Sequence, residues 1–213
     1  MCIRDRYRGS TKEHSDPLMR TYLEDLIYRL SETSEVRDRR FEFIILEDKT
    51  INAFAAPGGI IGINLGMFLN TEREGELASV MCHELAHLSQ RHFARSQNRN
   101  SPLANALMIL GSIAVAAASR NPEAILIAPA AMQQMSINYT RSNEKEADRI
   151  GFNNLVKAGF DPNDMTMMFQ RMQDKYQNED SEQFSYLMTH PLPSERLTDM
   201  RLSLIHISEP TRP

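Results

Sequence analysis

The pentapeptide HELAH at residues 83–87 restricts the fold of this chain more strongly than any other segment of its sequence. In a helix, at ~100° per residue, His83 and His87 share one face, so both imidazoles can bind the same ion. Glu84 can then reach a water beside that ion without binding the ion itself. The pattern favours a zinc site for peptide hydrolysis, in which the metal lowers the pKa of a water and a carboxylate moves the proton.

A catalytic zinc needs a third protein ligand and an open fourth position, and the candidates lie in the segment SNEKEAD at residues 142–148. Glu144 and Asp148 are four residues apart and share a helix face, whereas Glu146 points roughly 200° away from Glu144. We expect Glu144 to be the third metal ligand and Asp148 to accept a hydrogen bond that orients a ligand imidazole. A solvated acidic helix face is the alternative.

Two further residues are candidates for the same site. His190 precedes Pro191 in a segment expected to be extended, and it could reach the open zinc position as a fourth ligand. There it would displace the catalytic water and hold an enzyme latent; a supporting structural role is the alternative. Arg141 lies one turn before the acidic segment, and it could stabilise an oxyanion or form a salt bridge to Glu144 or Asp148.

Three other residues with reactive side chains are expected to lie outside the chemistry. Cys82 is next to the first histidine of HELAH but is rotated away from the metal face, so it is interpreted as a small buried apolar residue. His14 and His92 are expected to be surface residues.

Apolar periodicity predicts a mostly helical α+β chain with one small sheet. Thr71 and Glu74 fit a capping box, which predicts that the helix carrying HELAH begins there and runs to about Arg95. The turn sequence Pro-Gly-Gly at residues 57–59 separates two of three short apolar segments, and a small antiparallel meander is the simplest arrangement of the three. The predicted helices span 16–30, 71–95, 142–157 and 162–176, and the predicted strands span 41–46, 51–55 and 60–64.

Two stretches without charged residues, 100–119 and 124–140, lie between the predicted metal-binding helices. The first is long enough to cross a membrane, but its alanines, serines and asparagines would make insertion weak. With Pro122 and Pro129 as helix breakers, we expect residues 100–140 to form a hydrophobic helical hairpin. Such a hairpin would cover the cleft or lie on a membrane surface.

Composition excludes several classes of protein. With 41% hydrophobic residues and a net charge of −4 over 213 residues, the chain can bury a core and is not intrinsically disordered. Nine glycines and two cysteines exclude collagen-like chains and disulfide scaffolds. The negative charge gives no basic footprint, so nucleic acid is not an expected partner.

The two ends of the sequence indicate a translated sequencing adapter. Codons for residues 1–5 can be chosen whose reverse complement encodes Leu-Ser-Leu-Ile-His, which is the sequence at 202–206. We therefore expect residues 1–6 and 202–213 to be artefacts, and residues 7–201 to be a zinc metallopeptidase domain truncated at both ends. Genuine termini are the alternative.

Four motifs in this order resemble the gluzincins of metallopeptidase family 48, which includes the HtpX heat-shock proteases and the CAAX prenyl endopeptidases. They are NAFAAPGG at 52–59, HELAH at 83–87, the glutamate and aspartate of ExxxD at 144–148, and HPLPSERL at 190–197. The resemblance covers nearly all of residues 16–201. Within this family, the sequence most resembles a periplasmic branch that acts in outer-membrane protein assembly.

This resemblance implies a zincin-like metallopeptidase domain with its sheet beside the zinc-binding helix. It implies an endopeptidase with one Zn²⁺ per chain, with His83, His87 and Glu144 as ligands and Glu84 as general base. It also implies the periplasm of a Gram-negative bacterium and misfolded or stalled outer-membrane proteins as substrates. In that branch a signal peptide precedes the domain and tetratricopeptide repeats follow it.

Three other functions remain open from the sequence. The chain could be an HtpX-like membrane-associated quality-control protease, which would require residues 100–140 to associate with a membrane. It could be a chaperone-like binding module in which zinc is latent or structural. A chance motif in a helical adaptor would bind no metal.

Overall fold

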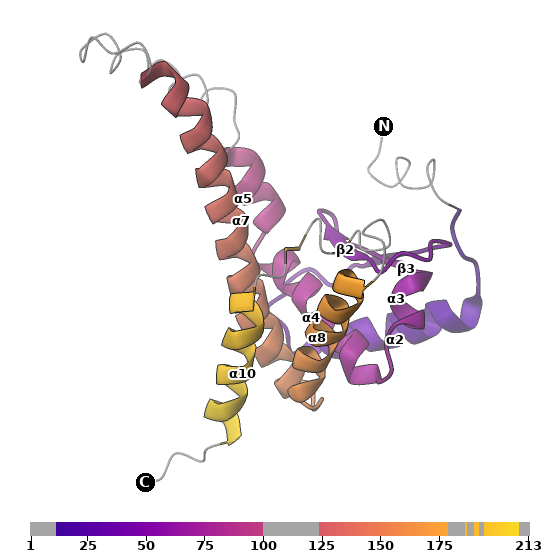
Figure 1. Cartoon of the computed structure of the whole chain (residues 1–213). Helices are drawn as coiled ribbons and strands as arrows, with labels where there is room; N and C mark the ends of the chain where they lie inside the picture. The colour runs from indigo at the N-terminus through magenta and orange to yellow at the C-terminus, as the bar shows by residue number, and fades with distance from the viewer. Residues whose placement is uncertain (1–11, 100–123, 179–185, 187–189, 192–193, 209–213) are drawn as a thin grey trace.

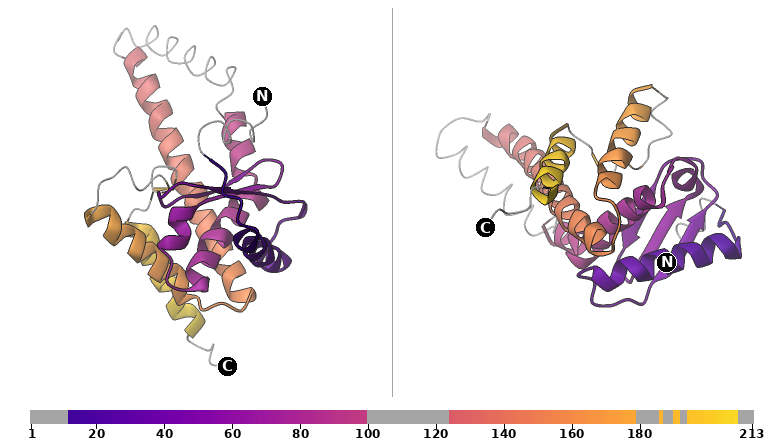
Figure 2. Two further views of the ribbon diagram at one scale, coloured as in Figure 1. Left: turned by 90° about the vertical axis from the view of Figure 1, so that its right-hand side faces the viewer. Right: turned by 90° about the horizontal axis from the view of Figure 1, so that it is seen from below.

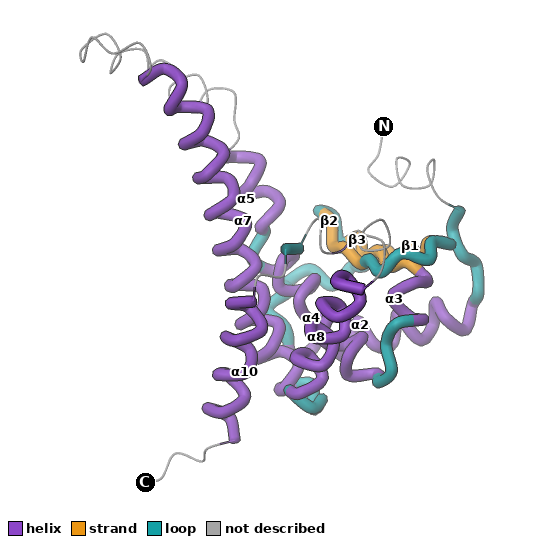
Figure 3. The backbone as a smooth tube through the Cα atoms, viewed as in Figure 1, coloured by secondary structure: helices purple, strands orange, loops and turns teal. Residues whose placement is uncertain are grey.

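The computed structural model describes residues 12–99, 124–178, 186, 190–191 and 194–208 (Figure 1). Helices and one small sheet make up this part of the chain, which confirms the predicted mostly helical α+β class (Figure 3). The helices are α2 (Pro17–Thr33), α3 (Leu65–Leu69), α4 (Glu74–Ser89), α5 (His92–Arg99), α7 (Ala124–Lys157), α8 (Asn163–Asn178) and α10 (Ser194–Ser208). The strands are β1 (Glu42–Leu46), β2 (Ala53–Ala56) and β3 (Ile60–Asn64).

The sheet is mixed, so the predicted antiparallel meander is wrong. Its strand order is β1-β3-β2: β2 and β3 form the predicted antiparallel hairpin around residues 57–59, but β1 runs parallel to β3. All five residues of β3 are buried, whereas three of the four residues of β2 are only half-buried. The most buried strand therefore takes the central position between the other two, and β2 is left at an edge.

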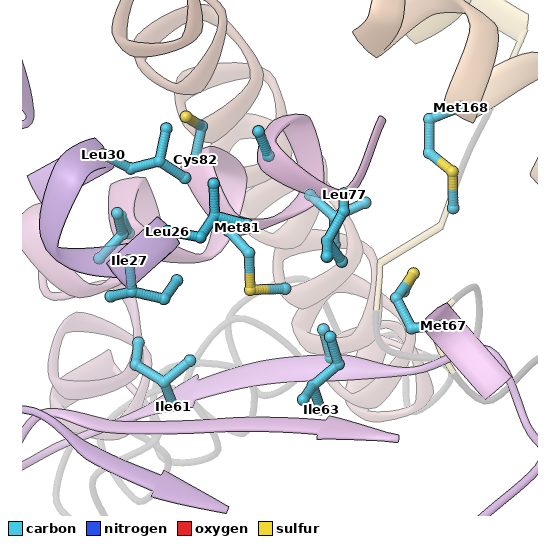
Figure 4. Close-up of a cluster of buried hydrophobic side chains, with 14 of the residues drawn as sticks. Leu26, Ile27, Leu30, Ile61, Ile63, Met67, Leu77, Met81, Cys82 and Met168 are labelled. Carbon is cyan, nitrogen blue, oxygen red and sulfur yellow. The ribbon is translucent and has the colours of Figure 1, made fainter. Parts of the chain in front are cut away.

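The two faces of the sheet are covered unequally. Helices α2 and α4 lie beneath one face (Figures 1 and 2), and Ile61 and Ile63 of β3 point toward Met81 and Leu77 of α4 (Figure 4). Among the described residues, the opposite face carries a smaller cluster of Ile44, Leu46 and Ile60, with Phe54 and Ala56 packed against it. The main core therefore lies between the sheet and the helices, with α4 at its centre.

Helix α4 is buried along almost its whole length, from Gly75 to Ala86, because it packs against β2, α2, α7 and α8. It begins at Glu74 and not at Thr71: Thr71 donates its hydroxyl to Phe68, and Glu76 accepts a 2.7 Å hydrogen bond from the backbone of Glu72. The predicted capping box is therefore wrong, since the buried Glu76 carboxylate binds the free backbone N–H ahead of the helix instead.

The helix that carries HELAH does not run on to Arg95 as predicted. It ends at Ser89, and Arg91 adopts a left-handed backbone conformation with φ 53° before α5 begins at His92. A single residue in this conformation ends one helix and starts the next at a new angle.

Helix α7 is longer than predicted, since it runs from Ala124 through Pro129 and contains the whole segment 142–157. Pro129 lies near the helix start, within the first two turns, and Pro122 lies outside the described residues. Most of the expected hairpin over residues 100–140 also falls outside them. In the part of the chain that is described, no helix is both long and apolar enough to cross a membrane. Helix α8 matches its prediction, and α10 was not predicted.

Candidate metal centre

Helix α4 brings the two histidines of HELAH together as the spacing predicted. His83 is fully buried and His87 is half-buried, and their Nε2 atoms lie 2.9 Å apart. Both rings face α7, which crosses close to α4. Gly151 of α7 permits this approach, because a Cβ at that position would lie 3.0 Å from the backbone nitrogen of His83.

Helix α7 places Glu144 against both imidazoles. One carboxylate oxygen lies 3.3 Å from His83 Nε2 and the other lies 3.4 Å from His87 Nε2. The loop before α10 adds His190, whose Nδ1 lies 3.2 Å from both oxygens of Glu144. One ligand atom from each of these four residues lies within 4.8 Å of all the others.

The chemistry of this cluster fits a divalent metal ion. Three imidazole nitrogens and one carboxylate, all mostly buried, converge on a space that a single ion can fill. Nitrogen and oxygen donors of this kind, in a compact set of four, suit zinc. Without an ion, several polar atoms would be crowded together in a buried place with few partners outside the cluster.

Asp148 lies one turn beyond Glu144 and contacts His83 on the side away from the cluster. Its Oδ1 atom lies 2.9 Å from His83 Nδ1, so the His83 Nε2 atom faces the other ligand atoms. Asp148 thus lies beside His83, where the sequence led us to expect it, and its role in orienting the imidazole stays a prediction. Burial raises the pKa of the Asp148 carboxyl, but His83 and Arg196 outweigh burial and lower that pKa overall.

Arg196 of α10 is a buried residue of the site that sequence reasoning missed. Its guanidinium binds Asp148 through two hydrogen bonds of 2.6 and 2.7 Å, and Nη1 lies 3.0 Å from Glu144. Arg141, for which a salt bridge to these carboxylates was one of two predicted roles, is exposed, and no salt bridge joins it to either of them in the described residues. The HPLPSERL motif contains Arg196, so that motif was the available signal.

Glu84 faces the cleft beside the cluster. Its Oε2 atom accepts a 3.0 Å hydrogen bond from the backbone N–H of Ala55 in β2, which fixes the carboxylate. Its Oε1 atom is buried, accepts no hydrogen bond within the described chain, and lies 3.5 Å from His190 Nε2. Burial raises the pKa of Glu84, while His190 and His83 oppose that rise. A fixed carboxylate with one free oxygen and a raised pKa is suited to proton transfer.

The charges within the cluster are unequal. Burial disfavours the ionised form of Glu144, but hydrogen bonds with His190 and His83 outweigh it and hold the pKa of that carboxyl well below its usual range. Burial also disfavours protonated His83, yet Asp148 and Glu144 raise the pKa of His83 to about 9. Burial and the neighbouring His83 lower the pKa of His87 well below its usual value. In the absence of metal, the surroundings therefore favour a proton on His83 over a proton on His87.

His190 is held in place by Tyr186. The two rings stack with centroids 4.6 Å apart and an interplanar angle of 27°, and the His190 backbone donates a 2.8 Å hydrogen bond to the Tyr186 carbonyl. His190 therefore reaches the cluster, as its position before Pro191 suggested it could. Tyr186 had no signal in the sequence.

The remaining predictions for single residues differ in outcome. Cys82 is fully buried and accepts a 3.4 Å hydrogen bond from Asn154, so it is a buried small residue as predicted. His14 lies away from the cluster and pairs with Glu47. His92, however, is 4% exposed and contacts His87, so its prediction as a surface residue is wrong. The break at Arg91 turns it inward.

A cleft with a volume of about 1210 Å³ opens onto the cluster. Glu84, His87, Glu144 and His190 line it, together with the strand and turn at residues 54–59 and much of the segment 87–96. The cleft is therefore large enough to hold several residues of an extended peptide beside the free oxygen of Glu84.

Comparison with known proteins points to one family. The sequence model of peptidase family M48 matches residues 17–203. A protein of Vibrio cholerae serotype O1 is 45% identical over 192 residues, which is 88% of this chain and 39% of that protein. The β-barrel assembly-enhancing protease of Escherichia coli O157:H7 is 39% identical over 203 residues, which is 91% of this chain and 40% of that protein.

A more distant relative is the mitochondrial metalloendopeptidase OMA1 of Schizosaccharomyces pombe, 28% identical over 199 residues, 91% of this chain and 57% of that protein. The chain thus spans about two fifths of the length of its bacterial relatives.

Proposed function

Because the chain belongs to peptidase family M48, whose members are metal-dependent, we propose that it is a zinc endopeptidase that cleaves peptide bonds in its cleft. The observation that carries this proposal is the buried group of three imidazoles and one carboxylate next to the free oxygen of Glu84. His83, His87 and Glu144 are the proposed zinc ligands.

The residues around the ligands set up the site before any metal binds. Asp148 holds His83 with its Nε2 atom toward the other ligand atoms. Arg196 neutralises part of the charge of Glu144 and Asp148, which keeps both carboxylates ionised in a buried place. When bound, zinc supplies Lewis acidity, which polarises the scissile carbonyl and lowers the pKa of the attacking water.

Glu84 is the proposed general base. Its Oε1 atom takes the proton of the attacking water and then gives that proton to the leaving amine. The hydrogen bond from Ala55 keeps Oε2 occupied, so the same oxygen faces the substrate in both steps. Ala55 belongs to the edge strand of the sheet, so Glu84 and the wall of the cleft are held by one element.

His190 is proposed to be a fourth ligand that keeps the enzyme latent. It lies 3.2 Å from Glu144 and 3.5 Å from Glu84, and these contacts support the proposal that His190 occupies the position otherwise open to water and substrate. Cleavage then requires His190 to move away. The exposed Arg141 could reach an oxyanion only if its side chain turned toward the cleft.

The names of the bacterial relatives support a role in assembly of outer-membrane β-barrels, and their organisms are Gram-negative bacteria. We accordingly propose a periplasmic location and misfolded or stalled outer-membrane proteins as substrates. Residues 100–140 would make any contact with a membrane surface, and most of them lie outside the described chain.

Digestion of casein by the purified chain, reloaded with zinc after chelation, tests the proposed activity. We expect cleavage that disappears on removal of zinc, returns with zinc, and is abolished by Glu84→Gln although that variant still binds zinc. Glu74→Gln on the exposed start of α4 is the matched control and should cleave like wild type. Bound zinc without cleavage in wild type and in His190→Ala would contradict the proposal and favour a binding module.

A further inference from the structure

We propose that His92 and Glu146 are positioning residues, which fix the tautomer and the ring orientation of His87 through a chain of two hydrogen bonds. The proposal rests on the proposed function in one respect, because it takes His87 as a metal ligand. Neither residue belongs to the cluster of four possible metal ligands, and both act on that cluster through His87.

The contacts run in one line across three elements. His92 Nδ1 lies 2.8 Å from His87 Nδ1, and the two rings are 4.8 Å apart at 76°. On its other side, His92 Nε2 lies 3.0 Å from Oε2 of Glu146 on α7. Arg95 of α5 lies 3.1 Å from the same oxygen and holds the carboxylate in place. His92 is 4% exposed, so its contact with His87 is buried, whereas the Glu146 end of the line reaches the surface.

The helix break makes this contact possible. In a continuous helix, residues five apart point ~140° away from each other, so His87 and His92 could not meet. The left-handed conformation of Arg91 ends α4 and turns α5, which brings the His92 ring back against His87. Such a conformation is unfavourable for a residue other than glycine, so the contact is made despite a backbone cost.

Proton counting along the line assigns each tautomer. An ionised Glu146 can only accept, so His92 donates its Nε2–H to Glu146. A neutral His92 then has a lone pair on Nδ1, and this atom accepts the Nδ1–H of His87. His87 is thereby left with its lone pair on Nε2, the atom that faces His83 and Glu144.

The two histidines of HELAH are therefore oriented by different means. Asp148 lies directly against His83 Nδ1, which is the usual arrangement of a carboxylate behind a metal-binding histidine. For His87, the contact at Nδ1 in the described chain is His92, with Glu146 behind it. Glu146 thus acts on His87 indirectly, through the hydrogen bond that it accepts from His92. It does so although it points away from Glu144 on the same helix.

Three substitutions of His92 separate orientation from packing. Asparagine can place its amide oxygen near the position of Nδ1 and so still accept from His87. Glutamine reaches the position of Nε2 and keeps only the contact with Glu146, and phenylalanine keeps neither. The matched control is His14→Gln, which removes a histidine from a His–Glu pair outside the site.

We propose two measurements on each variant. Competition with a chromophoric chelator gives the zinc affinity, and ¹⁵N NMR of labelled imidazoles gives the tautomer of each histidine in the metal-free protein. In wild type, we expect His87 to carry its proton on Nδ1. We expect His92→Gln and His92→Phe to lower zinc affinity by about 10–100-fold, and His92→Asn and His14→Gln to stay near wild type.

Several results would overturn the proposal. One is a wild-type His87 protonated on Nε2. Another is wild-type zinc affinity in both His92→Gln and His92→Phe. A third is an equal loss in all three His92 variants that parallels their loss of folding free energy, which would show a packing role alone. If wild type binds no zinc, the proposed function fails, and the tautomer of His87 still decides this inference.

Discussion

At the scale of single residues, the site depends on one buried arginine. Arg196 is 2% exposed and is the cation shared by Glu144 and Asp148, which are 3% and 1% exposed. Two carboxylates this close together in a buried place would otherwise repel each other and favour their protonated forms. Arg196 therefore belongs to both the stability of the metal-free fold and the charge of the metal site.

Arg196→Ala is expected to destabilise the metal-free protein by about 3–5 kcal/mol, because it removes the permanently charged cation that two buried carboxylates share. Urea unfolding of chelated protein measures this change. The control is Arg201→Ala, which removes an exposed arginine from the same helix and should change stability by less than about 0.5 kcal/mol. Equal effects of the two substitutions would contradict the role given to Arg196.

His190→Ala is expected to raise casein cleavage about tenfold or more while zinc stays bound. Removing a residue that occupies the open position increases the fraction of competent enzyme, and tenfold corresponds to about 1.4 kcal/mol. Initial rates, measured together with zinc content, test this expectation, and His14→Ala is the control. A fall in rate with zinc still bound would instead show that His190 assists catalysis.

Helical periodicity alone predicted that His83 and His87 lie on one helix face, because they are four residues apart. The same spacing predicted a shared face for Glu144 and Asp148. It could not predict Arg196 or Tyr186. Both come from segments whose contact with α4 and α7 depends on the tertiary fold and not on spacing. His92 was mispredicted because a continuous helix would have pointed it elsewhere.

At the scale of elements, the junction between α4 and α5 has the most consequence for the site. Arg91 provides the left-handed conformation that ends α4, and its side chain is exposed. The conformation of one backbone unit thus decides whether His92 faces the site or points elsewhere.

Arg91→Gly and Arg91→Val should differ in stability by about 1–2 kcal/mol, with glycine the more stable, because only the β-branched residue is strained at positive φ. The valine variant should also bind zinc more weakly, since relief of its strain moves His92 away from His87. Chemical unfolding and chelator competition measure the two effects. Equal stability of the two variants would mean that residue 91 is not held in this conformation.

The sheet shows a different limit of sequence reasoning. Alternation and turn residues located three strands and the β2–β3 hairpin, since those signals are local. The parallel pairing of β1 with β3 has no local signal, because it depends on which strand is buried deepest. Helix α10 begins at Ser194, and the apolar periodicity of the sequence did not predict it.

At the scale of the whole molecule, protons and metal compete for the same buried residues. His83 has a pKa raised to about 9 in the folded, metal-free protein, so it contributes stability that is complete below about pH 6.5 and is lost as pH rises through 9. Glu144 and Asp148 have lowered pKa values, so their contribution is present above about pH 4.5 and is lost as pH falls. These three groups together favour the metal-free fold most between about pH 4.5 and 6.5, but the lowered pKa of His87 opposes folding as pH falls below about 6.5. We therefore expect the metal-free protein to be most stable near pH 6.5.

Zinc should reverse this preference, because it binds only deprotonated imidazoles. We expect the rise in Tm caused by zinc to be larger at pH 8 than at pH 6. Thermal unfolding at fixed ionic strength, with and without zinc, measures the difference, and magnesium is the control ion. A zinc effect that is equal or smaller at pH 8 would contradict the assignment of His83 as a ligand.

Fold class and family were both predictable from the order of the motifs, and family M48 is confirmed over residues 17–203. The adapter origin of residues 1–6 and 202–213 stays a prediction. Substrate and partners stay proposals, because the chain spans only about two fifths of the length of its bacterial relatives.

Metal content of the purified chain, measured by mass spectrometry beside the variant His83→Ala/His87→Ala, tests the central claim most directly. The predicted result is one zinc per chain in wild type and none in the double variant, with both proteins folded by circular dichroism. A folded wild type without stoichiometric metal would contradict the claim, and so would a double variant that keeps its zinc.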